Sequence, residues 1–280
     1  MTGVDPACPA IVAAFRRRNV RSPAPSGAAA RAPMFRRRGS SYDLRNIREY
    51  QGSDDPRAID WKLYGRTDRA YVKEFYDEAS EGVAILADLS ASMAVIDQDG
   101  YRNFVASLAF ILAALGLGVS LWLYDSGLRG PRLALRQASG IRRVVDALDS
   151  AAFQGDTDTA RAYAALRGSR GERRVVVVSD FHERGLRLAP PPGGTLFLVR
   201  FRRPFTDLAG GPGEFEVADP ESGRLVVLPW DRAAAAEWAA RDRLLDKTLA
   251  GQDRRVALWT VNPGSDRAPV YWDILERLYG

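Results

Sequence analysis

The chain has 280 residues, enough for one domain with a complete hydrophobic core and additional segments. Hydrophobic residues make up 46% of the chain and charged residues 27%, values that are typical of a folded globular protein. The net charge of +5 is small, because 35 acidic residues balance most of the 40 basic ones, and the excess of arginine lies near the N-terminus. We therefore expect no specific binding of nucleic acid by the folded part.

The cysteine content and the apolar runs limit the cellular context. Cys8 is the only cysteine, which excludes an intramolecular disulfide and a site of several thiolates. The N-terminus lacks the basic start and long apolar core of a signal peptide, and no run approaches 18 apolar residues. The most apolar segment, 104–117, predicts a buried helix. We expect a protein without a membrane span in the cytoplasm.

Residues 1–35 predict a disordered basic tail. Arg, Ala, Pro and Ser dominate this segment, and the apolar residues show no sustained periodicity. The arginine clusters at 16–18 and 36–38 could contact an anionic membrane, nucleic acid or an acidic partner. A solvated tail explains the same composition, and we favour that interpretation.

The segment 36–82 combines charged and aromatic residues at high density. The alternation of polar and apolar residues at 71–76 favours a strand. Left in solvent, the aromatic residues of this segment would form a large exposed apolar surface. We therefore expect an N-terminal extension that packs on the domain that follows it.

Residues 83–280 alternate short apolar runs with helical stretches, which predicts an α/β domain with a doubly wound, mostly parallel sheet of Rossmann type. The four consecutive valines at 175–178 favour a strand that is covered on both faces. The other expected strands lie at 83–87, 119–124, 132–135, 195–201 and 256–261. The expected helices lie at 100–115, 140–149, 159–167, 231–250 and 271–279. Between strand 195–201 and the long helix, the proline and glycine of the segment 219–223 predict a hairpin of strands 214–217 and 224–228.

Three loops of this domain carry the side chains that could bind a ligand. One follows strand 83–87, one follows strand 175–178, and the third, 155–158, precedes a helix. In a doubly wound sheet, ligands bind at the carboxyl ends of the strands. The three loops contribute the side chains of Asp88, Ser90, Ser92, Thr157 and Asp180, with Asp158 in a supporting role. Carboxylates and hydroxyls without sulfur or imidazole favour Mg²⁺, with Mn²⁺ or Ca²⁺ as substitutes.

The same residues also have a structural interpretation. Serines that follow a strand often cap the next helix, as Ser90 and Ser92 could, and Asp158 could cap the helix after its own loop. Asp88 and Asp180, each at the end of a different strand, favour the metal site.

The residues just named resemble a known site. Asp88-Leu89-Ser90-Ala91-Ser92, with Thr157 and Asp180, is similar to the metal-ion-dependent adhesion site (MIDAS) of von Willebrand factor A (vWA) domains in motif, order and spacing. Upstream, the segment 48–62 resembles the signature of the DUF58 family, bacterial vWA-like proteins that are commonly encoded beside MoxR-type AAA+ ATPases. The signature residues are Arg48, Glu49, Tyr50, Asp54, Asp55, Arg57, Asp60 and Trp61. We interpret them as a structural cluster of ion pairs and packing contacts.

The resemblance, which extends from about residue 36 to the C-terminus, implies a function and roles for the site residues. Ser90 and Ser92 would bind the metal through their hydroxyls, the two aspartates directly or through water, and Thr157 in one conformational state. An acidic side chain of a protein partner would complete the metal shell. The chain would then be a metal-dependent binding adaptor that works with a MoxR-type AAA+ ATPase in maturation or metal insertion of a client complex.

The sequence supports an enzyme less well. It has neither a Gly-x-Ser-x-Gly nucleophile elbow nor a phosphate-binding loop. His182, the only histidine, could be a general base near the metal, but we interpret it as a loop residue. The alternative that remains is a magnesium-dependent phosphohydrolase of the haloacid-dehalogenase type. Such enzymes need a second aspartate two residues after the first, where this chain has Ser90, so we predict that the protein is not an enzyme.

Overall fold

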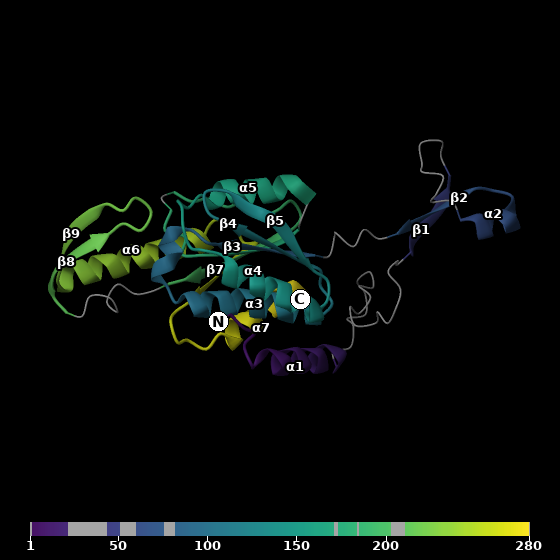
Figure 1. The fold of residues 1–280 in the computed structure, drawn as a ribbon. Coiled ribbons are helices and arrows are strands. Elements are labelled where there is room, and N and C mark those ends of the chain that lie inside the picture. Colours follow the sequence, from purple (N-terminus) through teal and green to yellow (C-terminus); the bar gives the residue numbers. More distant parts are fainter. Residues whose placement is uncertain are drawn as a thin grey trace. The chain divides into compact units, whose positions relative to one another are not determined.

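A computed structural model describes most of the chain. The chain divides into two units (Figure 1). The described residues are 2–21, 44–50, 60–75, 82–170, 173–183, 185–202 and 211–279. The smaller unit spans residues 26–80, and the larger one combines residues 1–25 with 81–280.

The smaller unit contains an antiparallel ribbon and one short helix. Strand β1 (Leu44–Glu49) pairs with β2 (Tyr71–Phe75), and α2 (Trp61–Thr67) lies between them in the sequence. The carboxylate of Asp60 accepts a hydrogen bond from the N–H of Leu63 at 3.3 Å, at the start of α2. The strand expected over 71–76 is thus confirmed. Whether this unit packs on the larger one stays a prediction.

The larger unit is built around one six-stranded sheet with the strand order β10-β7-β6-β3-β4-β5. The strands are β3 (Val83–Asp88), β4 (Val119–Tyr124), β5 (Leu128–Leu135), β6 (Arg174–Ser179), β7 (Thr195–Phe201) and β10 (Val256–Val261). All neighbouring pairs are parallel except β4 and β5, so the antiparallel strand lies at one edge. The mostly parallel, doubly wound α/β fold is confirmed.

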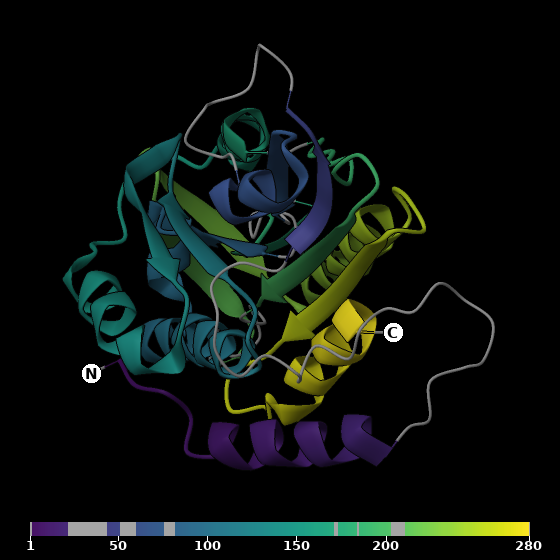
Figure 2. The ribbon, with the colours of Figure 1, turned by 90° about the vertical axis from the view of Figure 1, so that its right-hand side faces the viewer.

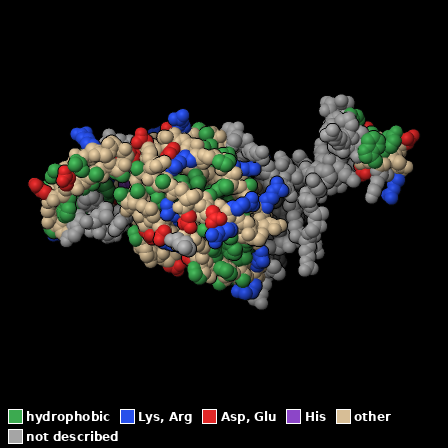
Figure 3. Space-filling model, in the orientation of Figure 1, with side chains coloured by type: hydrophobic (Ala, Val, Ile, Leu, Met, Phe, Trp, Pro, Cys, Tyr) green, Lys and Arg blue, Asp and Glu red, His purple; other side chains and the backbone are tan. Residues whose placement is uncertain are grey.

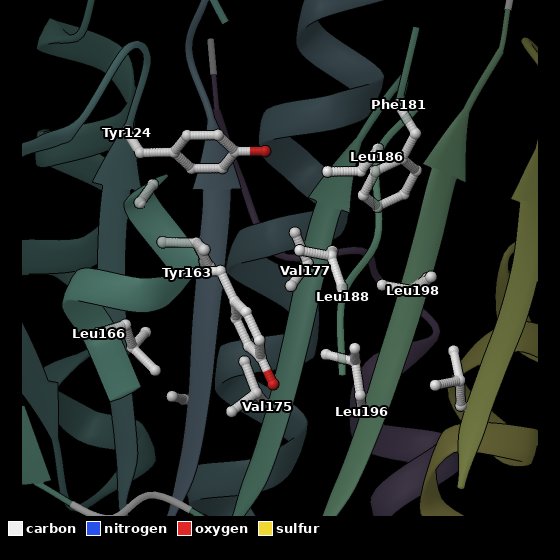
Figure 4. Close-up of a cluster of buried hydrophobic side chains, with 14 of the residues drawn as sticks. Tyr124, Tyr163, Leu166, Val175, Val177, Phe181, Leu186, Leu188, Leu196 and Leu198 are labelled. Atoms are coloured by element: carbon white, nitrogen blue, oxygen red, sulfur yellow. The ribbon is translucent and has the colours of Figure 1, made fainter. Parts of the chain in front are cut away.

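Helices cover both faces of this sheet (Figures 1 and 2). On one face lie α3 (Gln98–Ala114), α4 (Ile141–Ser150) and α7 (Ala268–Tyr279), and on the other lie α5 (Thr159–Arg170) and α6 (Arg232–Ala250). Tyr163 and Leu166 of α5 belong to one cluster of buried side chains together with Val175 and Val177 of β6 (Figure 4). The four valines of β6 are fully buried, as expected for a strand that is covered on both faces.

The predicted hairpin is also present, but it does not join the central sheet. Strands β8 (Gly213–Ala218) and β9 (Leu225–Trp230) form an antiparallel two-stranded sheet of their own, and β9 leads directly into α6. The hairpin therefore lies outside the central sheet and is connected to the core through α6, the helix that follows it in the sequence.

The disordered tail expected over 1–35 is wrong for its first part. Residues Cys8–Arg21 form α1, which lies beside α7 (Figures 1 and 2). The ring of Phe15 is 5.5 Å from that of Trp272 and 5.1 Å from that of Tyr279, measured between centroids.

The physical reason is helical periodicity that composition alone conceals. Cys8, Ile11, Val12 and Phe15 are buried, and their spacing of three and four residues places them on one face of a helix. The arginines at 16–18 are exposed. Residues 22–35 of the predicted tail lie outside the described part of the chain.

Candidate metal centre

Two aspartates stand where the strand order of the central sheet reverses. Within the sheet, β4 lies next to β3 on one side, and β6 lies next to β3 on the opposite side. Asp88 is the last residue of β3, and Asp180 directly follows β6. Because Ala87 pairs with Val178, the ends of these parallel strands lie side by side. This is the switch point at which doubly wound sheets bind their ligands.

The carboxylate of Asp88 is fully buried and held by two hydrogen bonds. Its Oδ1 accepts a bond from the backbone N–H of Ser90 at 2.8 Å, and its Oδ2 accepts one from the hydroxyl of Ser179 at 2.6 Å. Burial raises the pKa of Asp88 to about 7, and the nearby Asp180 carboxylate acts in the same direction. The strand ends thus hold two mutually repelling carboxylates, an arrangement that a bound cation would stabilise.

Ser90 and Ser92 present a pair of hydroxyl oxygens at this place. Their Oγ atoms are 3.1 Å apart, and Ser90 is fully buried. Adjacent ligands in an octahedral Mg²⁺ shell are about 3.0 Å apart, because the metal–oxygen distance is about 2.1 Å. Ser90 precedes the short 3-10 helix η3 (Ala91–Val95), yet its side chain makes no capping hydrogen bond to this described helix. The capping interpretation therefore does not explain Ser90, and the donor set fits a hard divalent cation.

The third loop lies against the first one. The N–H of Ala91 donates to the carbonyl of Gly155 at 2.9 Å, and the N–H of Gln154 donates to the carbonyl of Leu89 at the same distance. Asp158 accepts a bond from the N–H of Arg161 at 2.8 Å, so its side chain caps α5. The structural interpretation holds for Asp158, and its supporting role at a metal stays a prediction.

Thr157 makes a contact that the sequence did not predict. Its hydroxyl donates to Oε1 of Glu221 at 2.6 Å, across 64 positions of the chain. Glu221 lies in the turn of the β8–β9 hairpin, and the sequence suggested only a turn there. The structure thus brings the loops of Asp88, Ser90, Ser92, Asp180 and Thr157 together, but the Thr157 hydroxyl pairs with a carboxylate of the hairpin.

A buried arginine next to the site also escaped the sequence analysis. Arg200 in β7 is fully buried, and its guanidinium pairs with Asp242 and, at 2.7 Å, with Asp246 of α6. Its Nε donates to the carbonyl oxygen of Asp180 at 3.1 Å. A charged residue within the apolar strand 195–201 is the one signal that could have identified it. This cluster connects α6 to the loop that carries Asp180.

The single histidine is a loop residue, as expected. The N–H of His182 donates to Oδ1 of Asp180 at 3.1 Å, which fixes the loop after β6. Its exposed ring lies against that of Trp238 in α6, with the centroids 6.3 Å apart, and Nε2 is 3.4 Å from the guanidinium of Arg200. These contacts give His182 a packing role.

The family signature in the smaller unit is only partly described. Glu49 and Arg69 form an exposed ion pair of 3.5 Å, and Trp61 is 65% exposed with its ring edge-on to Tyr64 at 6.0 Å. Asp54, Asp55 and Arg57 lie outside the described residues. A cluster of ion pairs in this signature therefore stays a prediction.

The fold defines the larger unit as an α/β domain with a doubly wound, mostly parallel sheet. The comparison with protein families is more specific, because the family described as "Protein of unknown function DUF58" matches residues 46–244, more than half of the chain. The chain belongs to the DUF58 family. Comparison with curated proteins gave no match.

Several solved structures are similar to this chain at low sequence identity. The conserved hypothetical protein BatB from Bacteroides thetaiotaomicron is 11% identical with a TM-score of 0.43, and the match covers 70% of this chain and 98% of that one. A von Willebrand factor type A protein from Catenulispora acidiphila is 14% identical with a TM-score of 0.36, and the match covers 74% of this chain and 43% of that one. An aerotolerance-related membrane protein from Bacteroides fragilis is 14% identical with a TM-score of 0.36, covering 70% of this chain and 98% of that one.

The predicted cytoplasmic location is contradicted by these comparisons and is withdrawn. One of the similar structures is described as an aerotolerance-related membrane protein. Within the described ranges, none of the helices combines the length and the hydropathy that crossing a bilayer requires.

Proposed function

We propose that this protein is a metal-dependent adaptor that binds other proteins through the carboxyl edge of its central sheet. Asp88, Ser90, Ser92 and Asp180 would hold Mg²⁺, or Mn²⁺ or Ca²⁺ in its place, and Thr157 would join them in one state of the site. An acidic side chain of the partner would complete the shell. The observation that carries the proposal is the pair of hydroxyls 3.1 Å apart beside the buried Asp88.

The residues at this site favour the binding of a protein partner over the hydrolysis of a phosphate ester. Both oxygens of Asp88 already accept hydrogen bonds, from Ser90 and Ser179, so this carboxylate is held as an acceptor rather than exposed as a nucleophile. The residue two positions later is Ser90, where a phosphohydrolase of the haloacid-dehalogenase type needs an acid–base aspartate. The alternative is therefore not favoured.

The chemistry of such a site follows from its neutral ligands. A cation that is held by hydroxyls and few carboxylates keeps part of its positive charge and attracts a further carboxylate. The buried side chains Asp88 and Ser90 keep their positions because neighbouring backbone and hydroxyl groups fix them. A partner's aspartate or glutamate would bind more strongly here than on an exposed surface, since charge interactions strengthen where water is excluded.

The partner that we propose is a MoxR-type AAA+ ATPase, with a role in maturation or metal insertion of a client complex. This part rests on the DUF58 family to which the chain belongs, and on the expectation, stated above for that family, of genes beside those of such ATPases. A pull-down of the ATPase encoded nearest to this protein, with Mg²⁺ and with EDTA, tests it. Retention that is equal in EDTA would contradict a metal-dependent contact.

The metal site itself is tested by calorimetric titration with Mn²⁺. Asp88→Ala should weaken binding by more than about 100-fold, because it removes a charged group that is fully desolvated. Ser90→Ala should weaken it by only about tenfold, because it removes one neutral ligand. Asp146→Ala, on the exposed face of α4, is the matched control and should bind like the unaltered protein.

Far-ultraviolet circular dichroism of each variant should remain unchanged, which separates loss of a ligand from loss of the fold. Equal Mn²⁺ affinity in Asp88→Ala and in Asp146→Ala would exclude the site. Magnesium-dependent cleavage of a phosphate ester that disappears in Asp88→Ala would instead support the hydrolase.

A further inference from the structure

The β8–β9 hairpin of this same chain carries an acidic side chain to the proposed metal loops. Glu221 accepts a hydrogen bond from the hydroxyl of Thr157 at 2.6 Å. The loop of Thr157 is bonded to the loop of Ser90 through Gly155 and Ala91. A glutamate is the kind of ligand that a partner would supply at a cation with an open position. The structure therefore places a candidate ligand from within the chain at the edge of its own site.

The turn of the hairpin holds Glu221 in a defined place. Oδ1 of Asp219 accepts the N–H of Glu221 at 2.9 Å and that of Ser222 at 3.0 Å, and these bonds lower the pKa of Asp219. The turn closes at Gly223, whose φ of +68° is a conformation that glycine adopts without strain. The turn is thus ordered before any ligand binds, which reduces the entropy lost when Glu221 binds.

The hairpin is anchored less firmly than the core. It forms a separate two-stranded sheet, and among the described strands neither β8 nor β9 pairs with the central sheet. Leu225 and Val227 of β9 are 61% and 59% exposed, and the apolar residues of the other face, Phe215, Val217, Leu228 and Trp230, are only partly buried. Moving the hairpin would therefore uncover less apolar surface than moving a core strand would. Figure 3 shows hydrophobic and acidic side chains together on the surface in this part of the molecule. The base of the hairpin continues into α6, whose Asp242 and Asp246 remain fixed to Arg200.

We propose that Glu221 is an internal ligand of the metal site, and that the β8–β9 hairpin must be displaced before a partner's acidic side chain can bind. This inference rests on the proposed metal site. Metal binding then strengthens the contact of the hairpin with the Thr157 loop. A partner's carboxylate competes with that of Glu221, which is always nearby. The site therefore binds a partner's carboxylate more weakly than it would without Glu221.

The first test is Mn²⁺ titration of the full chain and of Glu221→Gln. Loss of the carboxylate should weaken Mn²⁺ binding by about tenfold, because a charge-assisted ligand is replaced by a neutral one. Glu216→Gln makes the same change of charge at an exposed position of β8 and should leave the affinity unchanged.

The second test is hydrogen exchange of residues 213–230 with and without Mg²⁺. In the unaltered chain, Mg²⁺ should slow exchange in the hairpin by at least about fivefold, because binding suppresses its opening. Glu221→Gln should abolish this protection, and Glu216→Gln should retain it.

The outcomes separate the two proposals. Normal metal binding by the unaltered chain, together with unchanged affinity and exchange in Glu221→Gln, overturns the internal ligand and leaves the metal site intact. Absence of Mn²⁺ binding by the unaltered chain overturns both. Weaker metal binding in Glu221→Gln, with loss of hairpin protection, supports the inference.

Discussion

The carboxyl edge of the central sheet and the β8–β9 hairpin differ in what holds them in place. At the sheet edge, Asp88 and Ser90 are fully buried, and hydrogen bonds fix the carboxylate from two sides. In the hairpin, Leu225 and Val227 are mostly exposed, and within the described part of the chain β8 and β9 pair with each other and not with the central sheet. The sheet edge therefore has the rigidity that the proposed metal site requires, and the hairpin has the weaker anchoring that the proposed displacement of Glu221 requires.

The connection between the two regions can be broken at Arg200. Arg200→Met should lower the free energy of unfolding by about 3 kcal/mol, because it removes the fully buried partner of Asp242 and of the half-buried Asp246, while Arg202 still pairs with Asp242. Urea unfolding followed by circular dichroism measures the change. Arg241→Met, which removes a well-exposed pair with Glu237, is the control and should have little effect. Similar midpoints for the two variants would show that the buried cluster does not anchor α6.

Burial predicts that α1 belongs with the rigid part of the molecule. Phe15→Ala should lower the free energy of unfolding by about 3 kcal/mol, because its ring packs between Trp272 and Tyr279 of α7. The measurement is again urea unfolding, with Arg17→Ala on the exposed face as the control. A Phe15→Ala protein as stable as this control would restore the tail interpretation.

The comparison is sharpened by one substitution made in both regions. Val177→Ala in β6 should cost about 2 kcal/mol, because the side chain is fully buried in the core. Val227→Ala in β9 should cost less than about 0.5 kcal/mol, because the side chain is mostly exposed. Thermal melts of the two variants check this difference. A larger loss from Val227→Ala would mean that the hairpin is anchored more firmly than its exposure indicates.

Local sequence patterns were sufficient for the elements of the sheet. The valines at 175–178, the apolar runs at 195–201 and 256–261, and the hairpin around Gly223 each fix a backbone conformation through neighbouring residues. The position of Asp88 at the end of a strand followed from the same patterns. The helix α1 was missed because its four buried residues are few, a proline and alanines lie between them, and a run of arginines follows.

The sequence by itself determined the α/β class, the DUF58 family and the residues that could bind a cation, because these depend on local periodicity and on motif spacing. Only the tertiary structure decided that Asp158 caps a helix, that Arg200 is neutralised by α6, and that Glu221 reaches Thr157. The last two contacts join residues 42 to 64 positions apart. No local pattern specifies such pairs, because the packing of whole elements sets the distance between them.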